Sequence, residues 1–397
     1  MNHQLVIVKR NDKVLSCLLE DKNLVQINAT DGRNSSVLGN IYIGKVKNIV
    51  KNINAAFVEI ADGIMGYYSL EENKTPIFVN AKKNDKVNIG DEILVQVEKE
   101  GVKTKAPVLT SHLNFVGKYA VLTYGKLTLG VSNKITDEPK KQQFKQLLQS
   151  FKNEEYGLVV RTNAKEATLE QITEEIQTLH NRFHMIKEFG VHKTCFSCLM
   201  KSPSQYLCDI RDGYDTSIQK IVTDDMELYE EIKEYMTEYQ PMDLNKLVLY
   251  EDKMISLTSV YSIETKLEKA LQQRVWLKSG GYLVIEPTEA LVVIDVNTGK
   301  ATAGKKNAEE TFFRVNMEAA VEIAKQIRLR NLSGIIIIDF IDVKSQEKKE
   351  ELMARLRELL SKDPVRTIVV DMTPLNLVEV TRKKVRKPLY EQLTKEK

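Results

Sequence analysis

Two apolar runs that each end in an aspartate constrain this chain more than any other feature. Residues 290–295 are ALVVID, residues 334–339 are GIIIID, and residues 309–330 between them carry their apolar side chains on one helical face. A strand, a crossover helix and a second strand form a parallel pair, whose carboxyl ends lie at the same edge of the sheet. We therefore expect Asp295 and Asp339 to be neighbours.

A cation between these two aspartates would explain why they stand together. Two neighbouring carboxylates repel each other unless a positive charge lies between them. Magnesium takes oxygen ligands, usually one or two carboxylates with several waters, and can activate water at a phosphoryl group. Asn297 can orient that water or donate to the phosphate, and Asp342 adds a further acid. The other interpretation, that each aspartate only caps a helix or closes a turn, is left open by the pattern alone.

Composition bounds the class of protein. The 397 residues, 42% of them hydrophobic, predict a multidomain protein with two to four domains. A net charge of +3, from 58 basic and 55 acidic side chains, does not by itself require nucleic acid. No apolar stretch approaches the about 20 residues that span a membrane, and MNHQLVIVKRND is unlike a signal peptide. With four cysteines, too few for a disulfide framework, we expect a cytoplasmic protein without a membrane partner.

A series of short strands begins at residue 39. NIYIGKVKNIV, AAFVEI and GYYSL are followed, beyond a polar loop, by EILVQVEKE, and this pattern predicts a small closed barrel of the OB type. Phe57 and Tyr67 lie on two of these strands and Lys105 follows the last. Single-stranded nucleic acid is held by such aromatic faces and cations. For Phe57, a place in the barrel core is the competing interpretation.

Two smaller groups of residues suggest anion or metal binding. Arg161 and Thr162 in LVVRTNA form a cation and hydroxyl pair that suits a terminal phosphate, although such a pair is more often a surface feature. A Cys-x-x-Cys motif supplies two thiolates that could bind zinc, but the remaining spacings fit no standard zinc pattern, so metal binding there stays open. The residues of this second group are His192, Cys195, Cys198 and Cys208.

The stretch from SGGYLVIEPTEALVVIDVNTGKATAG through EETFFRVNMEAAVEIAKQIRLRNLSGIIIIDFID resembles the catalytic segment of the ribonuclease E/G family of bacterial endoribonucleases. The resemblance continues through GNIYIGKVKNIVKNINAAFVEI, GLVVRT and SIETKLEKALQQRV and covers nearly the whole chain. It implies a multidomain fold that mixes α+β and α/β parts. The implied parts are an RNase H-like scaffold at 1–35 and 206–270, an S1-like OB RNA-binding domain at 36–111, a 5′-sensor region at 112–205 and a DNase I-like catalytic subdomain at 271–397.

The resemblance also implies roles for single residues. The family's catalytic residues match Asp295, Asn297 and Asp339, of which the two aspartates hold Mg²⁺ and the asparagine assists at the scissile phosphate. Its RNA-clamping positions match Phe57, Tyr67 and Lys105, with Tyr67 where the family more often has Phe. Its pocket for a 5′-monophosphate matches Gly117, Val121, Arg161, Thr162 and Arg366.

The function that these similarities imply is a Mg²⁺-dependent endoribonuclease of the ribonuclease G-like type. It would cleave single-stranded RNA to leave 5′-phosphate and 3′-hydroxyl ends in rRNA and tRNA processing and mRNA decay. The alternative is a non-catalytic RNA-binding protein that uses the OB barrel. A nucleotide-using phosphotransferase is disfavoured, since no G-x-x-x-x-G-K-[ST] or G-x-G-x-x-G loop is present.

The assembly state is open. In the family, a Cys-Pro-x-Cys motif just beyond the catalytic subdomain binds zinc and links two protomers. This chain ends at EQLTKEK without that motif. Either the sequence stops before that motif or the protein dispenses with zinc, so the pattern leaves a zinc-linked assembly open, as it does the choice between a homodimer and a homotetramer.

Overall fold

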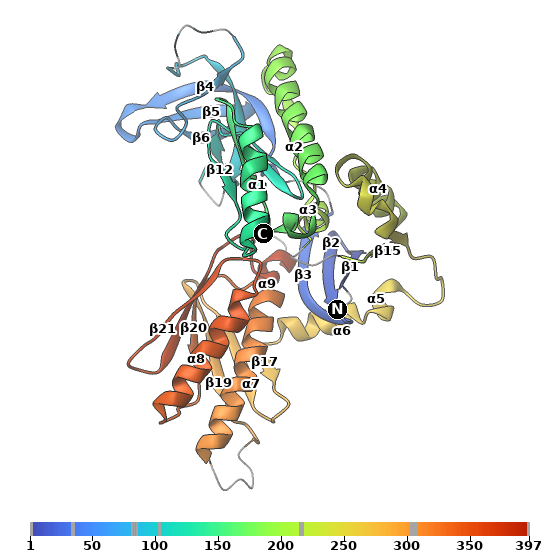
Figure 1. The fold of residues 1–397 in the computed structure, drawn as a ribbon, viewed down its shortest axis with the longest axis vertical. Coiled ribbons are helices and arrows are strands. Elements are labelled where there is room, and N and C mark those ends of the chain that lie inside the picture. Colours follow the sequence, from blue (N-terminus) through green and yellow to red (C-terminus); the bar gives the residue numbers. More distant parts are fainter. Residues whose placement is uncertain are drawn as a thin grey trace. The chain divides into compact units, whose positions relative to one another are not determined.

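The computed structural model describes residues 3–32, 36–80, 82, 84, 86–101, 105–213, 218–301 and 308–394, and these form a mixed α and β fold (Figure 1). The chain divides into two compact units, residues 34–215 and residues 1–33 with 216–397. Each unit contains two sheets within its described part. No helix in the described ranges is long and apolar enough to cross a membrane.

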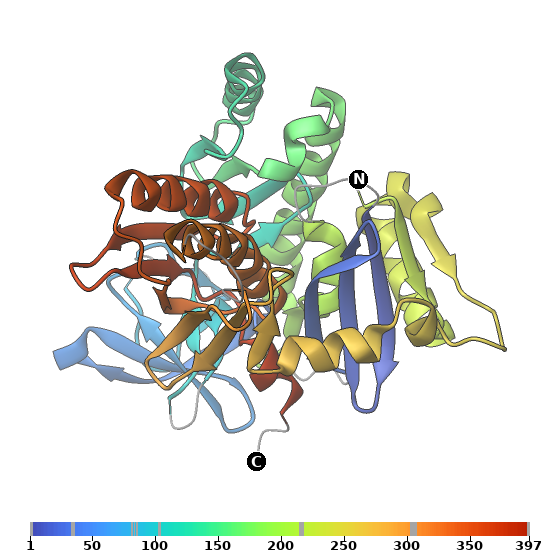
Figure 2. The ribbon, with the colours of Figure 1, turned by 90° about the horizontal axis from the view of Figure 1, so that it is seen from below.

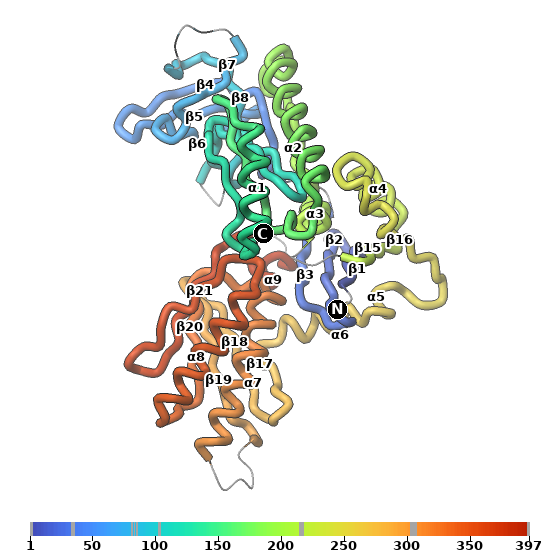
Figure 3. Tube along the Cα trace, viewed as in Figure 1, coloured from blue at the N-terminus to red at the C-terminus, as the bar shows by residue number. Residues whose placement is uncertain are grey.

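The first sheet joins the start of the chain to residues more than 200 positions later. Its order is β16 (Leu247–Leu249), β15 (Lys220–Thr223), β1 (His3–Arg10), β2 (Lys13–Glu20) and β3 (Asn23–Asp31). β1 and β15 pair in parallel, and Figure 3 shows these segments side by side. The accompanying helices are α4 (Met226–Tyr239), η5 (Pro241–Lys246), α5 (Leu257–Val260) and α6 (Ile263–Leu271).

The predicted OB-type barrel is confirmed as a closed barrel of five strands. In order around the barrel these are β4 (Ile41–Val50), β5 (Ala55–Ala61), β6 (Ile64–Ser69), β9 (Val108–Thr110) and β8 (Glu92–Lys99). Pairing of β4 with β8 closes the ring, and the interior is filled by side chains such as Val58, Tyr68 and Val95. The remaining small elements here are η1 (Lys51–Ile53), β7 (Ile77–Phe78) and β14 (Cys198–Met200).

A four-stranded sheet with several helical elements completes the unit formed by residues 34–215. Its order is β10 (Asn114–Val116), β11 (Ala120–Tyr124), β13 (Tyr156–Val160) and β12 (Leu129–Val131). The helical elements are α1 (Glu138–Ser150), η2 (Thr162–Glu166), α2 (Leu169–His184), η3 (Met185–Phe189), η4 (Gly190–His192) and α3 (Gln205–Asp212). A capping box between Thr168 and Gln171 begins α2, which buries its apolar stripe against the sheet. Leu169, which the periodicity placed in that stripe, is instead 39% exposed because it occupies the first turn.

A six-stranded sheet carries the two aspartates. Its order is β17 (Arg274–Trp276), β18 (Tyr282–Pro287), β19 (Leu291–Asn297), β20 (Gly334–Asp339), β22 (Leu377–Arg382) and β21 (Thr367–Met372). The long helices α7 (Ala308–Leu329) and α8 (Gln346–Ser361) cover one face, as Figure 2 shows, and α9 (Leu389–Leu393) follows the last strand. On β19 the buried side chains Val292, Ile294 and Val296 face these helices. The alternate residues, which include Asp295 and Asn297, are partly exposed on the opposite face.

β19 and β20, which α7 connects along the chain, pair in parallel as predicted. One expectation was wrong: β19 does not end at Asp295 but continues to Asn297, because the β18–β19 hairpin pairs Asn297 with Tyr282. Residues 302–307 of the family-like stretch, and residue 35 at a predicted domain boundary, lie outside the described residues. The RNase H-like and DNase I-like assignments, and the domain boundaries, stay predictions.

Candidate active site

Asp295 and Asp339 are side by side at one edge of the six-stranded sheet. The parallel ladder pairs residues 291–295 with residues 335–339 one to one, and its last pair is Asp295 with Asp339. Paired residues on neighbouring strands are about 5 Å apart and project to the same face. The expected neighbourhood of the two carboxylates is therefore confirmed, while their catalytic role stays a prediction.

The charges that act on Asp339 are negative. Partial burial, followed by the negative charges of Asp295 and Asp342, raises the pKa of Asp339. Asp295 accepts a hydrogen bond from the side-chain amide of Asn297, at 2.7 Å between Oδ2 and Nδ2. In the described chain, no group of three His, Cys, Asp or Glu side chains is placed to bind a metal. The pair thus offers two hard oxygen donors, which is the number of carboxylates that magnesium usually takes.

Two turns that contain Gly281 and Gly299 position Asn297. A Cβ on Gly281 would lie 2.9 Å from the carbonyl oxygen of Asn297, closer than real Cβ contacts, so only glycine lets the two segments approach. Gly299 has a φ of +52°, in the left-handed region, and its turn is held by a 3.1 Å hydrogen bond from the Lys300 N–H to the Gly280 carbonyl. The turn before β18 and the turn after β19 therefore fix the Asn297 side chain beside Asp295.

A buried asparagine fixes the chain just after Asp339. Asn316 of α7 is fully buried, and its amide donates to the Ile341 carbonyl at 2.7 Å. Its carbonyl oxygen accepts from the Ile341 N–H at 3.0 Å. Asn376 donates to Asp342 at 2.9 Å and accepts from the Lys349 ammonium at 2.7 Å. Sequence reasoning missed both asparagines, although a polar residue on the apolar face of α7 was a signal for the first.

The proposed aromatic platform lies on the outside of the barrel. Phe57 of β5 is opposite Tyr67 of β6, and their rings meet edge to face with centroids 6.3 Å apart. Both side chains are half-buried, whereas the alternate residues fill the core, so the core interpretation of Phe57 is wrong. Lys105 is exposed and lies two residues before Pro107, whose carbonyl accepts from the Tyr67 N–H at 2.8 Å. A role of these three residues in RNA binding stays a prediction.

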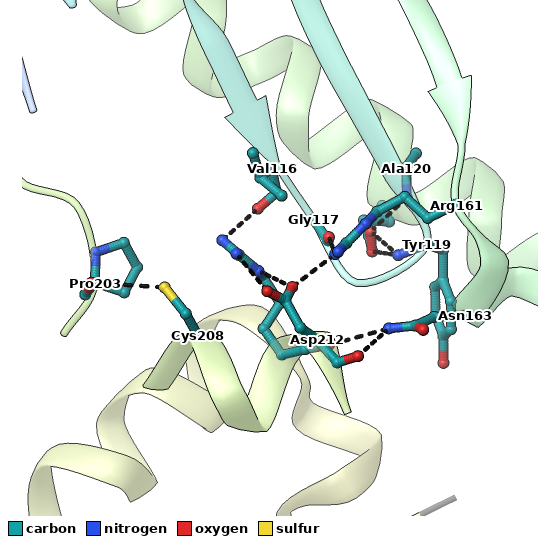
Figure 4. A network of polar contacts seen from close by, with 11 residues as sticks. Val116, Gly117, Tyr119, Ala120, Arg161, Asn163, Pro203, Cys208 and Asp212 are labelled. Carbon is teal, nitrogen blue, oxygen red and sulfur yellow. Dashed lines mark hydrogen bonds and ion pairs between the residues drawn. The ribbon is translucent and has the colours of Figure 1, made fainter. Parts of the chain in front are cut away.

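The residues predicted to bind a terminal phosphate are partly brought together. Arg161 donates from Nη1 to the Gly117 carbonyl at 2.6 Å and pairs with Asp212 at 2.9 Å (Figure 4). Arg211 also pairs with Asp212, at 2.8 Å from Nε. Burial alone would raise the pKa of Asp212, but the two guanidinium groups outweigh it and hold that pKa below its usual value. The Arg161 cation is therefore already engaged by a carboxylate that the sequence did not indicate.

A second unforeseen carboxylate explains why residue 117 is a glycine. Glu175 of α2 accepts from the Tyr119 N–H at 2.7 Å, and its oxygen fills the space that a Cβ on Gly117 would need. Burial raises the pKa of Glu175, against the hydrogen bonds that it accepts from the backbone. Thr162 shares a 2.8 Å hydroxyl hydrogen bond with Ser132. Val121 is half-buried on β11, and Arg366 belongs to the other compact unit.

The ion pairs of Asp212 with Arg161 and Arg211 can be tested by replacing Asp212. We expect Asp212→Asn to lower the free energy of unfolding at neutral pH by about 1 to 3 kcal/mol, because two partly buried guanidinium groups lose their carboxylate. A carboxyl whose folded pKa is lowered stabilises above its unfolded pKa of about 3.9 and loses this effect as the pH falls through the folded pKa. Denaturant unfolding should therefore show a difference at pH 7 that begins to shrink near pH 4 and is lost below the lowered folded pKa of Asp212. An equal difference at both pH values would contradict the assignment.

The possible zinc residues do not form a recognisable site in the described chain. His192 ends η4, Cys195 lies in the loop before β14, and Cys198 begins that strand. Cys208 is buried in α3 and its thiol donates to the Pro203 carbonyl at 3.7 Å. These residues are not among any group of three ligands placed for a metal within the described ranges.

Comparison with known proteins identifies close sequence relatives. The sequence profile of the Ribonuclease E/G family matches residues 114–385. Ribonuclease G of Haemophilus influenzae is 34% identical over 389 residues, which cover 96% of this chain and 79% of that protein. Ribonuclease G of Escherichia coli K12 is 32% identical over 91% of this chain and 75% of its own length. Ribonuclease E of Synechocystis is 33% identical over 90% of this chain and 54% of its own length.

Proposed function

Because this chain belongs to the ribonuclease E/G family, we propose that it is an endoribonuclease that hydrolyses single-stranded RNA with Mg²⁺ held by Asp295 and Asp339. The products would carry 5′-phosphate and 3′-hydroxyl ends. The substrates in the cell would be rRNA and tRNA precursors and mRNA, processed in the cytoplasm. Nucleases of this family are metal-dependent in general. The choice of magnesium is part of the proposal.

The observation that carries the proposal is the in-register pair of carboxylates on the partly exposed face of the sheet. The donor set suits a hard divalent ion, since both side chains are carboxylates and the charges that act on Asp339 are negative. When bound, such an ion would supply an activated water and neutralise charge on the phosphoryl oxygen. A structural role would instead call for a positive partner between the two acids, whereas Asp295 has the neutral amide of Asn297 as its partner.

The chain's own residues would position the phosphodiester. The Asn297 amide has two N–H groups, of which one donates to Asp295, so the other is available to a phosphate oxygen. Its bond to Asp295 also holds the carboxylate in one rotamer. The Asn316 bonds to Ile341 keep the segment after Asp339 rigid, which holds this second carboxylate in register with the first. These contacts would align the carboxylate pair without any movement of the sheet.

The barrel would hold the RNA strand by stacking bases on Phe57 and Tyr67. We expect Tyr67→Leu to weaken binding of a single-stranded RNA by about 1 to 3 kcal/mol, the usual effect of losing one stacked base. Tyr67→Phe is the control, since it keeps the ring and the contact with Phe57, and it should bind almost normally. Fluorescence anisotropy with labelled RNA in the presence of a chelator measures both. Normal binding by the leucine variant would remove Tyr67 from the proposed interface.

The 5′ end of the RNA would be recognised by the residues around Arg161. A 5′-monophosphate would compete with Asp212 for the Arg161 guanidinium, and the hydroxyl of Thr162, which now bonds to Ser132, would donate to the same phosphate. Gly117 and Val121 of the same compact unit are the other members of the proposed pocket, and the expected role of Arg366, which belongs to the other unit, is a separate proposal. Cleavage of the same RNA with a 5′-monophosphate should be faster than with a 5′-hydroxyl or a 5′-triphosphate.

The decisive experiment incubates the protein with a short 5′-monophosphorylated RNA, with and without Mg²⁺. The proposal predicts Mg²⁺-dependent fragments whose new 5′ ends carry a phosphate. Salt-sensitive RNA binding with no Mg²⁺-dependent product would instead favour a non-catalytic RNA-binding protein.

A further inference from the structure

An aromatic and cationic cluster with no role in the mechanism above lies on β17 and β18. Trp276 is the chain's single tryptophan and is 61% exposed. Its ring lies 5.2 Å from that of Tyr282, centroid to centroid, at an angle of 57°. The guanidinium of Arg274 lies over the Tyr282 ring, with its central carbon 4.5 Å from the ring centroid. We call Arg274, Trp276 and Tyr282 the Trp276 cluster.

The Trp276 cluster lies on the same face of the sheet as the carboxylate pair. Trp276 pairs with Tyr282, and Tyr282 pairs with Asn297 across the next strand. Paired side chains project to one face, and so do residues two apart on a strand, so Asp295 shares this face. Trp276 is two strand spacings from Asn297, which is about 10 Å.

Two exposed lysines lie in the turns at this end of the sheet. Lys278 is exposed in the turn after β17, and Lys300 is exposed in the turn after β19. The hydrogen bond from the Lys300 N–H to Gly280 holds the two turns together. Phosphates that approach Asp295 and Asp339 would therefore meet cations beside the aromatic rings, which is the combination that proteins use for single-stranded nucleic acid.

We propose that Trp276 and Tyr282, supported by Arg274, form a subsite on which an unpaired RNA base next to the scissile phosphate stacks. The inference rests on the proposed function, because it requires RNA to cross the carboxylate pair. An exposed tryptophan, tyrosine and arginine together also suit a protein contact. RNA is favoured because the cluster shares its sheet face and its strand register with Asp295 and Asn297.

The single tryptophan makes the contact directly observable. Titration of the whole protein with a short single-stranded RNA, in a chelator so that nothing is cleaved, should quench the tryptophan emission in a saturable way. The same RNA with abasic positions around the cleavage site should bind with clearly less quenching. Lack of any quenching by the intact RNA, while that RNA is cleaved in Mg²⁺, would overturn the inference and leave the proposed function standing.

Kinetics supply the second readout. Trp276→Leu should lower kcat/KM for single-stranded RNA about 5- to 150-fold, the range that corresponds to one lost stacking contact, and Trp276→Tyr should restore most of it. Ile368→Ala is the matched control, because Ile368 is an exposed apolar residue of the edge strand β21 in the same sheet. It should cleave normally.

The possible results separate the two claims. Wild-type kinetics in the Trp276→Leu variant would refute the subsite. The Trp276 cluster would then be interpreted as a contact surface for a protein partner. Quenching by RNA in a protein that never cleaves would refute the proposed function and, with it, a subsite beside a scissile phosphate.

Discussion

Asp295→Asn is expected to slow RNA cleavage about 1,000-fold or more while RNA affinity stays nearly unchanged. The substitution keeps the size of the side chain and removes one of the two charges that would hold the divalent ion. Loss of the ion's charge stabilisation at the phosphoryl group costs several kcal/mol in the transition state, and about 1.4 kcal/mol corresponds to a factor of ten. Single-turnover cleavage at saturating protein measures the rate, and anisotropy in a chelator measures the affinity.

The stability of the same variant distinguishes a metal site from a structural pair. A carboxyl whose folded pKa is raised, as for Asp339, destabilises the fold increasingly as the pH rises above its unfolded pKa. Removing the Asp295 charge relieves the part of this effect that comes from that charge, while the larger contribution of burial remains. In a chelator, the variant should therefore gain stability relative to the wild type between about pH 4 and pH 7, and Mg²⁺ should stabilise only the wild type. A variant that is less stable than the wild type at pH 7 in a chelator would indicate a structural role instead.

Asn316→Leu is expected to destabilise the protein by about 2 to 6 kcal/mol and to impair cleavage although both carboxylates remain. Leucine matches asparagine in size, but it leaves the N–H and the carbonyl of Ile341 buried without their partners. Each unsatisfied group costs about 1 to 3 kcal/mol. The segment that follows Asp339 then loses its anchor to α7. Chemical denaturation and single-turnover kinetics give the two magnitudes.

A buried asparagine in the other unit provides the control. Asn73 accepts from the Ser111 N–H at 2.7 Å and from the Thr110 hydroxyl at 2.9 Å, and it is also buried, 4% exposed against 0% for Asn316. Asn73→Leu should cost comparable stability but should keep the stabilisation by Mg²⁺. Asn316→Leu should lose that stabilisation. If both variants respond to Mg²⁺ like the wild type, Asn316 does not position the site.

The carboxylate pair could be predicted because its causes are local. An apolar run, an amphipathic helix and a second apolar run specify a parallel crossover, and a parallel pair brings equivalent strand ends together. The barrel could be predicted for the same reason, since alternation and turn residues specify short antiparallel strands. The strand end at Asp295 was wrong because strand length depends on the partner, and Tyr282 of the hairpin extends β19 to Asn297.

The residues that sequence reasoning missed act through partners that only the fold brings close. Asn316 binds the backbone of Ile341, so the type of side chain at position 341 gives no indication of this contact. Asp212 meets Arg161 from a helix about 50 positions away, and Glu175 reaches the backbone of Tyr119. Nearly every residue has the same backbone N–H and C=O groups, so a hydrogen bond to the backbone cannot be predicted from the type of residue that receives it. The Trp276 cluster was missed because it lies near Asp295 only through the pairing registers of β17, β18 and β19.

The number of divalent ions bound per chain tests the central claim most directly. Electron paramagnetic resonance of Mn²⁺, as a substitute for Mg²⁺, counts bound ions in the RNA-free protein and in single variants. We predict one site in the wild type and its loss in both Asp295→Asn and Asp339→Asn, with Asp371→Asn, an exposed acid of β21, as the unaffected control. Equal Mn²⁺ binding by the wild type and the two site variants would contradict a shared metal between these carboxylates.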